Sequence, residues 1–257
     1  VTWYTNDNMP AQDVSAQISS LSARVNQTAL PQELKDRITS RLDRLSKLSS
    51  SADVFDEVEH LANYIEWVVG LPWDKRSQDV LDLKSAKEVL DKHHFGLTDI
   101  KNRVLEFISI MKLNKEKEQS SIARAPILCF VGLVGTGKTT VAYSIAGALG
   151  RQIARVPFGG MGSALDLRGQ SRVHPEAEPG QIIKAVKKAG TKNPVVLLDE
   201  IDRTADDARS SIMGVLVELL DPEQNHAFHD YYIYYPFNLS EVLFVATANN
   251  TTNISTA

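Results

Sequence analysis

The sequence is poor in the residues that build disulfide frameworks and zinc sites. It has a single cysteine, Cys129, and none of its six histidines lies in a Cys/His cluster with the spacing of zinc ligands. One cysteine excludes an intrachain disulfide. Because Cys129 lies inside the apolar run 127–131, we expect it to be a buried structural thiol. A reducing, intracellular setting fits this composition best.

Long hydrophobic runs and a charge excess of one sign are also absent. No apolar stretch reaches the roughly 18 to 20 residues that span a bilayer, and the N-terminus lacks the basic-then-apolar layout of a signal peptide. The formal net charge is −4, from 28 basic and 32 acidic residues. No global field therefore attracts nucleic acid or an anionic membrane, and we expect neither partner.

What is present is the composition of an ordinary globular protein. The 257 residues are 43% hydrophobic and 23% charged, which suits one large domain or two smaller ones with a core that needs no disulfides or metals.

The first part of the chain has the apolar periodicity of helices. Three stripes recur at helical spacing, and the third ends at Gly70-Leu71-Pro72, a stop signal. Their members are Val14, Ile18, Leu21 and Val25, then Leu34, Ile38, Leu42, Leu45 and Leu48, then Val54, Val58, Leu61, Ile65 and Val68. The stripes are short, so a small antiparallel bundle or hairpin is expected. Two more helices are predicted over 82–93 and from 98 to about 111, followed by an exposed connection over 112–125.

From Pro126 the period changes. Short apolar runs at 127–131, 195–198 and 242–246, with a weaker one at 153–158, have the pattern of buried parallel strands. Helical segments separate them. This alternation predicts an α/β fold with a doubly wound, mainly parallel sheet.

The turn after the first predicted strand matches the phosphate-binding pattern G-x-x-x-x-G-K-[ST]. Its glycines let backbone N–H groups approach phosphate oxygens, its lysine reaches the β- and γ-phosphates, and its last hydroxyl can ligate Mg²⁺. The helix that follows directs its positive end at the same charge. The predicted ATP/ADP-binding residues here are Gly132, Leu133, Val134, Gly135, Thr136, Gly137, Lys138, Thr139 and Thr140.

Two acidic residues end the apolar run 195–198. Asp199 would lie beside the phosphates and hold Mg²⁺ together with Thr139, and Glu200 would polarise the attacking water. A further polar residue, Asn249, follows the run 242–246. If that strand lies next to the first one, Asn249 could orient the lytic water, and a capping role in a turn explains it equally well.

Several strings resemble the Lon family of ATP-dependent proteases. They cover roughly residues 54–250, and the most diagnostic is Asp-Pro-Glu-Gln-Asn at 221–225. The others are the segments 71–73, 89–97, 132–139, 197–202, 219–220 and 244–249. The resemblance implies an AAA+ large subdomain over 126–257, a helical lead-in and linker over 76–125, and the helical end of an N-terminal region over 1–75.

The same resemblance implies roles for individual residues. Glu200 would activate the lytic water, Asn249 would be the sensor 1 residue, and His94, Phe95 and Gly96 would border the adenine pocket. Lon proteins work as homo-hexamers that thread unfolded or damaged proteins into a Ser-Lys peptidase chamber, in the cytoplasm or in a mitochondrial or peroxisomal matrix. In that family the arginine finger, the small helical subdomain and the peptidase follow sensor 1, so we expect them to lie outside these residues.

The sequence departs from the Lon pattern at four places. Leu133 and Val134 replace two prolines, and 161–164 replaces an acidic stretch. In the substrate-gripping loop, 168–176, His174 replaces a tyrosine and Pro175 its apolar neighbour. Near the second pore loop, the sequence of 210–214 differs from the one that Lon proteins usually have there, and Ala208 replaces a larger residue. One hypothesis is that these changes weaken or retune the grip of the pore loops on the substrate. The other is sequence drift within the family, with other loop residues gripping the substrate. A His174→Tyr change in the full-length hexamer tests the first, since no gain in unfolding activity would count against it.

Two other functions fit parts of this pattern. A divergent Lon-like chain could bind ATP as a non-proteolytic scaffold or chaperone. A different P-loop ATPase, such as a clamp or helicase loader, would be expected to carry a basic stripe for DNA, which this chain lacks.

Overall fold

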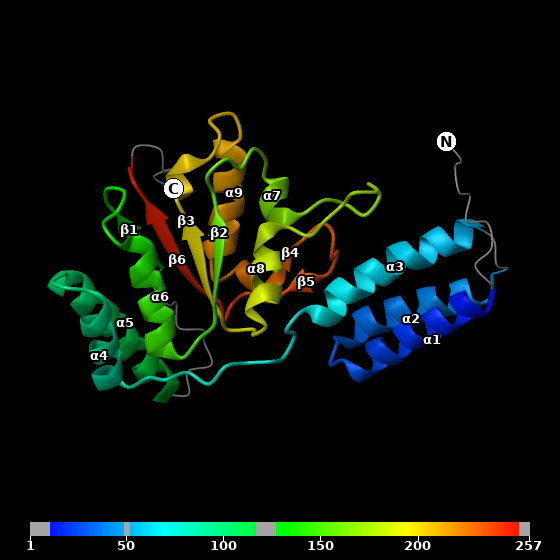
Figure 1. Ribbon diagram of the computed structural model, residues 1–257, viewed down its shortest axis with the longest axis horizontal. Helices are drawn as coiled ribbons and strands as arrows, with labels where there is room; N and C mark the ends of the chain where they lie inside the picture. Colours follow the sequence, from blue (N-terminus) through cyan, green and yellow to red (C-terminus); the bar gives the residue numbers. More distant parts are fainter. Residues whose placement is uncertain (1–10, 49–51, 117–126, 252–257) are drawn as a thin grey trace, which may run out of the picture. The chain divides into compact units, whose positions relative to one another are not determined.

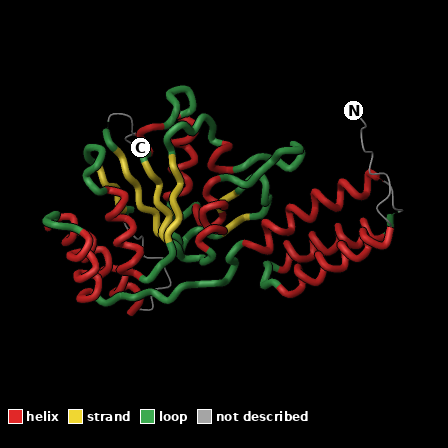
Figure 2. The backbone as a smooth tube through the Cα atoms, viewed as in Figure 1, coloured by secondary structure: helices red, strands yellow, loops and turns green. Residues whose placement is uncertain are grey.

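The computed structural model describes residues 11–48, 52–116 and 127–251. The chain divides into two compact units, Val1–Trp73 and Asp74–Ala257. In the described part of the first unit the regular structure is helical, and the second unit contains the sheet (Figure 2).

The first unit contains helices α1 (Ala11–Gln27), α2 (Gln32–Ser46) and α3 (Ala52–Gly70). Helix α1 packs against both α2 and α3. The residues of the predicted apolar stripes are buried, with the exception of Leu48, which is exposed, and Val14, which is half-buried. Helix α3 ends at the expected stop signal, where the Trp73 indole Nε1 donates a hydrogen bond of 2.8 Å to the carbonyl of Val68. The predicted N-terminal helices are thus confirmed.

The second unit begins with a strap, residues 74–82, that runs to helix α4 (Leu83–His93). Asp82 caps this helix by accepting hydrogen bonds from the backbone N–H groups of Lys84 and Ser85. Helix α5 spans Thr98–Glu116. The expectation of an exposed connection from residue 112 was therefore wrong for 112–116, which continue the helix. The rest of that connection lies outside the described residues.

Four parallel strands form the main sheet: β1 (Leu128–Val131), β2 (Ile153–Pro157), β3 (Val195–Asp199) and β6 (Leu243–Ala248). Their order in the sheet is β1-β6-β3-β2. Because the strands are parallel, crossover connections join them. Every residue of β3 and β6 is buried, which explains why these strands are apolar apart from Asp199 and Thr247. All four predicted strands are present, and the predicted α/β class is confirmed.

Helices cover both faces of the sheet (Figure 1). Helix α6 (Lys138–Leu149) packs with α4 and α5 on one face, in a core that includes alternate residues of β1, β3 and β6. Helices α7 (Leu165–Arg168), α8 (Gln181–Ala189) and α9 (Arg209–Leu220) lie on the other. A small hairpin of β4 (Phe228–His229) and β5 (Pro236–Phe237) follows α9, and 3-10 turns span Ile201–Arg203 and Asn225–Ala227.

The expectation of a buried Cys129 was wrong, because its side chain is exposed. Leu128 points into the core beneath α6, so the next residue on the strand points to the opposite face. Strand β1 ends the order of the sheet in the described residues, and Val131 on that same face is exposed as well. Partial desolvation and the charge of Asp202 raise the pKa of the Cys129 thiol. Among the described helices, none has the length and apolar character of a membrane span.

Candidate nucleotide-binding site

Three strands end at one edge of the sheet with polar residues. The glycine-rich turn 132–137 follows β1, Asp199 ends β3, and Asn249 follows β6. Strand β6 pairs with both β1 and β3, as the sensor interpretation of Asn249 requires. Parallel sheets bind ligands beyond the carboxyl ends of their strands, so this edge is the natural place for one.

The turn 132–137 has the backbone shape of a phosphate cradle. Gly135 and Gly137 have φ values of 83° and 85°, which L side chains rarely adopt, and Gly137 is the N-cap of α6. Leu133, Val134, Gly135 and Thr136 are exposed, while Lys138 and Thr139 are half-buried at the start of the helix. The unpaired N–H groups of the first helical turn therefore open toward solvent at this edge.

Lys138 and Asn249 lie in contact. The ammonium of Lys138 donates to Asn249 Oδ1 at 2.9 Å and to the carbonyls of Gly132 and Leu133 at 2.7 and 2.9 Å. Asn249 Nδ2 in turn donates to Glu200 Oε1 at 3.4 Å. The amide of Asn249 thus bridges the lysine of the turn and the carboxylate after β3.

Asp199 is buried, and both of its carboxylate oxygens have partners. Oδ1 accepts a hydrogen bond from Thr247 Oγ1 at 2.5 Å and a longer one from Thr139 Oγ1 at 3.4 Å. Oδ2 accepts from Arg155 Nε on β2 at 2.6 Å. Because hydroxyls donate to one oxygen and a guanidinium donates to the other, the carboxylate has a fixed orientation.

Glu200 has a backbone conformation that is rare for its residue type. Its φ and ψ are 57° and 51°, in the left-handed region. Its N–H donates to Thr247 Oγ1 at 2.9 Å, and its carboxylate lies 3.3 Å from the guanidinium of Arg203. The neighbouring Asp202 accepts from the N–H groups of Asn249 and Asn250 at 3.0 and 3.2 Å, which fixes the turn after β6.

The donor set at this edge fits Mg²⁺ held with a phosphate ligand. No cluster of three or more His, Cys, Asp or Glu residues that could hold a metal ion occurs within 11–48, 52–116 or 127–251. Thr139 Oγ1 and Asp199 Oδ1 lie 3.4 Å apart. Mg²⁺ is usually bound by one or two such oxygen ligands together with water and substrate phosphates.

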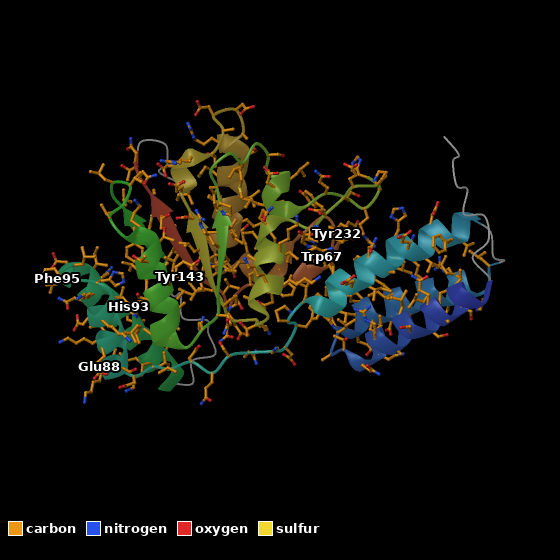
Figure 3. All side chains as sticks on the ribbon, viewed as in Figure 1. Trp67, Glu88, His93, Phe95, Tyr143 and Tyr232 are labelled. Atoms are coloured by element: carbon orange, nitrogen blue, oxygen red, sulfur yellow. The ribbon has the colours of Figure 1, made fainter. Side chains whose placement is uncertain are left out.

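Of the three predicted adenine-pocket residues, the structure places His94 against α6. His94 is buried, and its Nε2 forms a hydrogen bond of 2.9 Å with Ser144 Oγ. Burial lowers the pKa of His94, and the charges of His93 and Lys101 act in the same direction. Phe95 is fully exposed and projects outward at the turn after α4, where Gly96 has a φ of 67° (Figure 3). Ser144 lies six residues after Lys138, about 9 Å along the helix axis.

The loop expected to grip substrate has a tightly closed neck and an exposed tip. Gln170 N–H donates to the Glu178 carbonyl at 3.1 Å, and Gly180 N–H donates to the buried Asp230 carboxylate at 2.7 Å. A Cβ on Gly180 would lie 2.0 Å from the Leu167 carbonyl oxygen, so only glycine fits there. Residues 170–176 are all exposed, including His174. In contrast, 210–214 belongs to helix α9, and Ala208 at its N-cap is buried.

Sequence reasoning missed Arg155, Thr247 and Asp202 at this site. Arg155 pairs with Leu197 in the β2–β3 register, which puts it on the same face as Asp199, two residues further along. Only the register reveals that contact. Thr247 offered a signal: it is a hydroxyl residue inside an otherwise apolar buried strand.

Comparison with known proteins gives a matching family. Residues 128–257 match the family model described as "ATPase family associated with various cellular activities (AAA)". This match covers half of the chain and includes the turn 132–137, Asp199, Glu200 and Asn249. The chain belongs to the AAA family of ATPases.

Within that family the chain is of the Lon type. It is 43% identical over 247 residues to "Lon protease" of Lawsonia intracellularis, covering 96% of this chain and 29% of that protein. It is 42% identical over 240 residues to "Lon protease 1" of Bacillus subtilis, covering 93% of this chain and 30% of that protein. The chain thus spans about three tenths of the length of these relatives.

Proposed function

We propose that this chain is the ATP-binding and ATP-hydrolysing motor segment of a Lon-type protease. The observation that carries the proposal is the continuous set of contacts at the sheet edge. Lys138 bonds to Asn249, Asn249 bonds to Glu200, and Asp199 lies against Thr139. These are the groups that a P-loop ATPase uses to bind phosphate, hold a metal and position a water.

Each residue has a role that follows from its place. The backbone of 132–137 and the ammonium of Lys138 bind the phosphates, and Thr139 and Asp199 hold Mg²⁺, which neutralises phosphate charge when bound. The carboxylate of Glu200 accepts a proton from the attacking water, and Asn249 orients that water beside the terminal phosphate. Asn249 also forms hydrogen bonds to both the Lys138 ammonium and the Glu200 carboxylate. The group that binds phosphate and the group that activates water are therefore held in place by the same amide.

The proposal extends to the full-length protein. The relatives' printed name, Lon protease, supports action on proteins. That the full-length protein works as a homo-hexamer on unfolded or damaged proteins is what the resemblance to the Lon family implies. Because these relatives come from bacteria, a cytoplasmic setting is favoured over an organelle matrix. Phosphoryl-transfer motors gain about 10³ to 10⁵ in rate from an arginine supplied by a neighbour. We therefore expect this chain alone to bind ADP and ATP and to turn ATP over slowly.

The test compares two variants with the parent chain. Lys138→Ala should weaken binding of a fluorescent ADP by about tenfold or more, because it removes a charge-assisted bond to phosphate. Glu200→Gln should keep nucleotide affinity and lower hydrolysis by about 10² to 10⁴ in single-turnover assays, since it removes the base.

The matched control is Lys188→Ala, which removes an exposed lysine of α8 and should change neither quantity. Equal affinity of Lys138→Ala and the parent would contradict the phosphate-binding role. Unchanged hydrolysis by Glu200→Gln would remove that residue from the role of base.

A further inference from the structure

Thr247 is the one polar side chain inside strand β6. The other five residues of the strand are apolar, and Leu243 and Val245 face the core beneath α6. Side chains alternate along a strand, so Thr247 faces the same side, toward the helix that begins at Lys138. Valine has the same shape as threonine and would continue the apolar pattern. The hydroxyl is therefore the feature that needs an explanation.

A buried hydroxyl is unfavourable unless it finds partners, and this one has two. Thr247 is 0% exposed. Its Oγ1 donates to Asp199 Oδ1 at 2.5 Å and accepts from the backbone N–H of Glu200 at 2.9 Å. A single atom on β6 thus contacts the two consecutive acidic residues that end β3.

Each of these hydrogen bonds fixes a different property of the site. The bond to Asp199 Oδ1 holds this oxygen next to the hydroxyl of Thr139, while Arg155 holds the other oxygen. Without Thr247, the carboxylate would keep its strong contact to Arg155 and only the long contact to Thr139. The bond from Glu200 N–H stabilises a backbone conformation that lies in the left-handed region. Its loss would let the chain after β3 relax.

We propose that Thr247 is a positioning residue of the ATP site, whose hydroxyl orients Asp199 for the metal and Glu200 for the lytic water. This inference rests on the proposed function. Thr247 does not contact nucleotide itself, because it is covered and acts through its two neighbours. Its effect should therefore be seen in metal binding and in the exchange of the Glu200 amide, and should not depend on the total stability of the domain.

Two pairs of variants isolate the hydroxyl. Thr247→Val removes it at constant shape. Thr247→Ser and Thr247→Ala both lack the methyl group and differ from each other in the hydroxyl. The control is Thr191→Val, because the hydroxyl of this buried threonine has no hydrogen-bond partner among the residues that the structure describes. Circular dichroism first shows which variants are folded.

The readout is the binding of Mn²⁺, as a paramagnetic substitute for Mg²⁺, to this chain saturated with ADP, followed by electron paramagnetic resonance. The half-saturating Mn²⁺ concentration should rise about tenfold in Thr247→Val and in Thr247→Ala, the size expected for a lost bond to a charged group. It should stay within about twofold of the parent in Thr247→Ser and Thr191→Val. Hydrogen exchange of the Glu200 amide should quicken by about tenfold in the two variants without a hydroxyl.

Three results are decisive against the inference. Equal Mn²⁺ affinity in Thr247→Val and the parent would overturn it, as would equal weakening in Thr247→Ser and Thr247→Ala. Weakening in Thr191→Val of the same size would show a general effect of core changes, and would overturn it too. If the parent chain bound ADP and Mn²⁺ but no variant changed the Mn²⁺ affinity, the inference about Thr247 would fail while the proposed function remained supported. If the parent chain showed no ADP-dependent Mn²⁺ binding, the proposed function itself would fail, and the inference with it.

Discussion

Among single residues, Asp199 shows how a buried carboxylate is held in place by hydrogen-bond donors on both of its oxygens. The hydroxyl of Thr247 and the guanidinium of Arg155 both donate to it, at 2.5 and 2.6 Å. A buried carboxylate without such donors would be strongly disfavoured in water-poor surroundings. The same donors also restrict the carboxylate to one orientation, which a metal ligand needs.

Cys129 gives a prediction at this scale. Because the thiol is exposed and is the single cysteine of the sequence, a maleimide should label the native chain once. Its pKa is raised by desolvation and by Asp202, so labelling should be slow at neutral pH and should quicken about tenfold for each pH unit as the thiolate forms. Mass spectrometry of timed samples measures this. Cys129→Ser is the control, and labelling that requires denaturant would contradict the exposed position.

This cysteine also shows where sequence reasoning fails. The apolar run 127–131 correctly predicted a strand, and β3 and β6 were equally readable. The burial of a residue on a strand depends on the face of the sheet to which its side chain points and on whether the strand lies at the edge of the sheet. The sequence of a single segment reveals neither. The contact between Arg155 and Asp199 was hidden for the same reason, since it depends on the register of two strands far apart in sequence. The turn 132–137 was predictable because its chemistry is local.

At the scale of elements, glycines at the neck of the loop 170–179 allow close passage of two chain segments. Changing Gly180 to alanine should lower the free energy of unfolding by about 1 to 3 kcal/mol, because its Cβ would meet the carbonyl of Leu167 at 2.0 Å. Urea unfolding measures the loss. The control is Gly147→Ala inside α6, where a Cβ meets nothing within 4 Å. There the change should add about 0.5 to 1 kcal/mol. Equal stability of the two variants would contradict the close-passage explanation.

The strap 74–82 is tied to the sheet unit by ion pairs. Arg76 forms two short contacts with Glu241, at 2.6 and 2.7 Å, and Arg151 holds Asp79 at 2.7 and 2.8 Å. Asn193 adds hydrogen bonds to the backbone of Ser77. These contacts indicate that the strap is an ordered part of the unit Asp74–Ala257.

The pair of Arg76 and Glu241 makes stability depend on pH. The hydrogen bond from Arg76, helped by Lys192, lowers the pKa of Glu241 below its ordinary value of 4.5. A lowered pKa means that this stabilisation is present above pH 4.5 and is lost as pH falls through the folded-state pKa. Glu241→Gln should therefore cost about 0.5 to 1 kcal/mol at pH 7, the range for partly exposed pairs, and much less at pH 3.

Thermal unfolding at the two pH values measures the difference. Glu106→Gln removes one partner of the exposed pair between Arg103 and Glu106, and should change stability little at either pH. A Glu241→Gln cost that stays constant between pH 7 and pH 3 would mean that the ion pair is not its source.

At the scale of the whole molecule, the two compact units predict separate responses to nucleotide. ADP at 100 times its dissociation constant should stabilise the unit Asp74–Ala257 by about 2.7 kcal/mol, by mass action. The helical unit Val1–Trp73 contains no part of the candidate site, so hydrogen exchange in α1 to α3 should not change. Exchange measured with and without ADP tests this. Equal protection of both units would show that they unfold together.

The left-handed backbone of Glu200 has a consequence for how this sequence would change under selection. Asparagine and glycine adopt a φ of 57° with less strain than glutamate, by about 1 kcal/mol. If a library of variants were selected only for resistance to heat, this position would be expected to drift toward those residues, while losing the carboxylate that we propose as the base for the lytic water. Glutamate at this angle is thus a place where durability and turnover favour different amino acids.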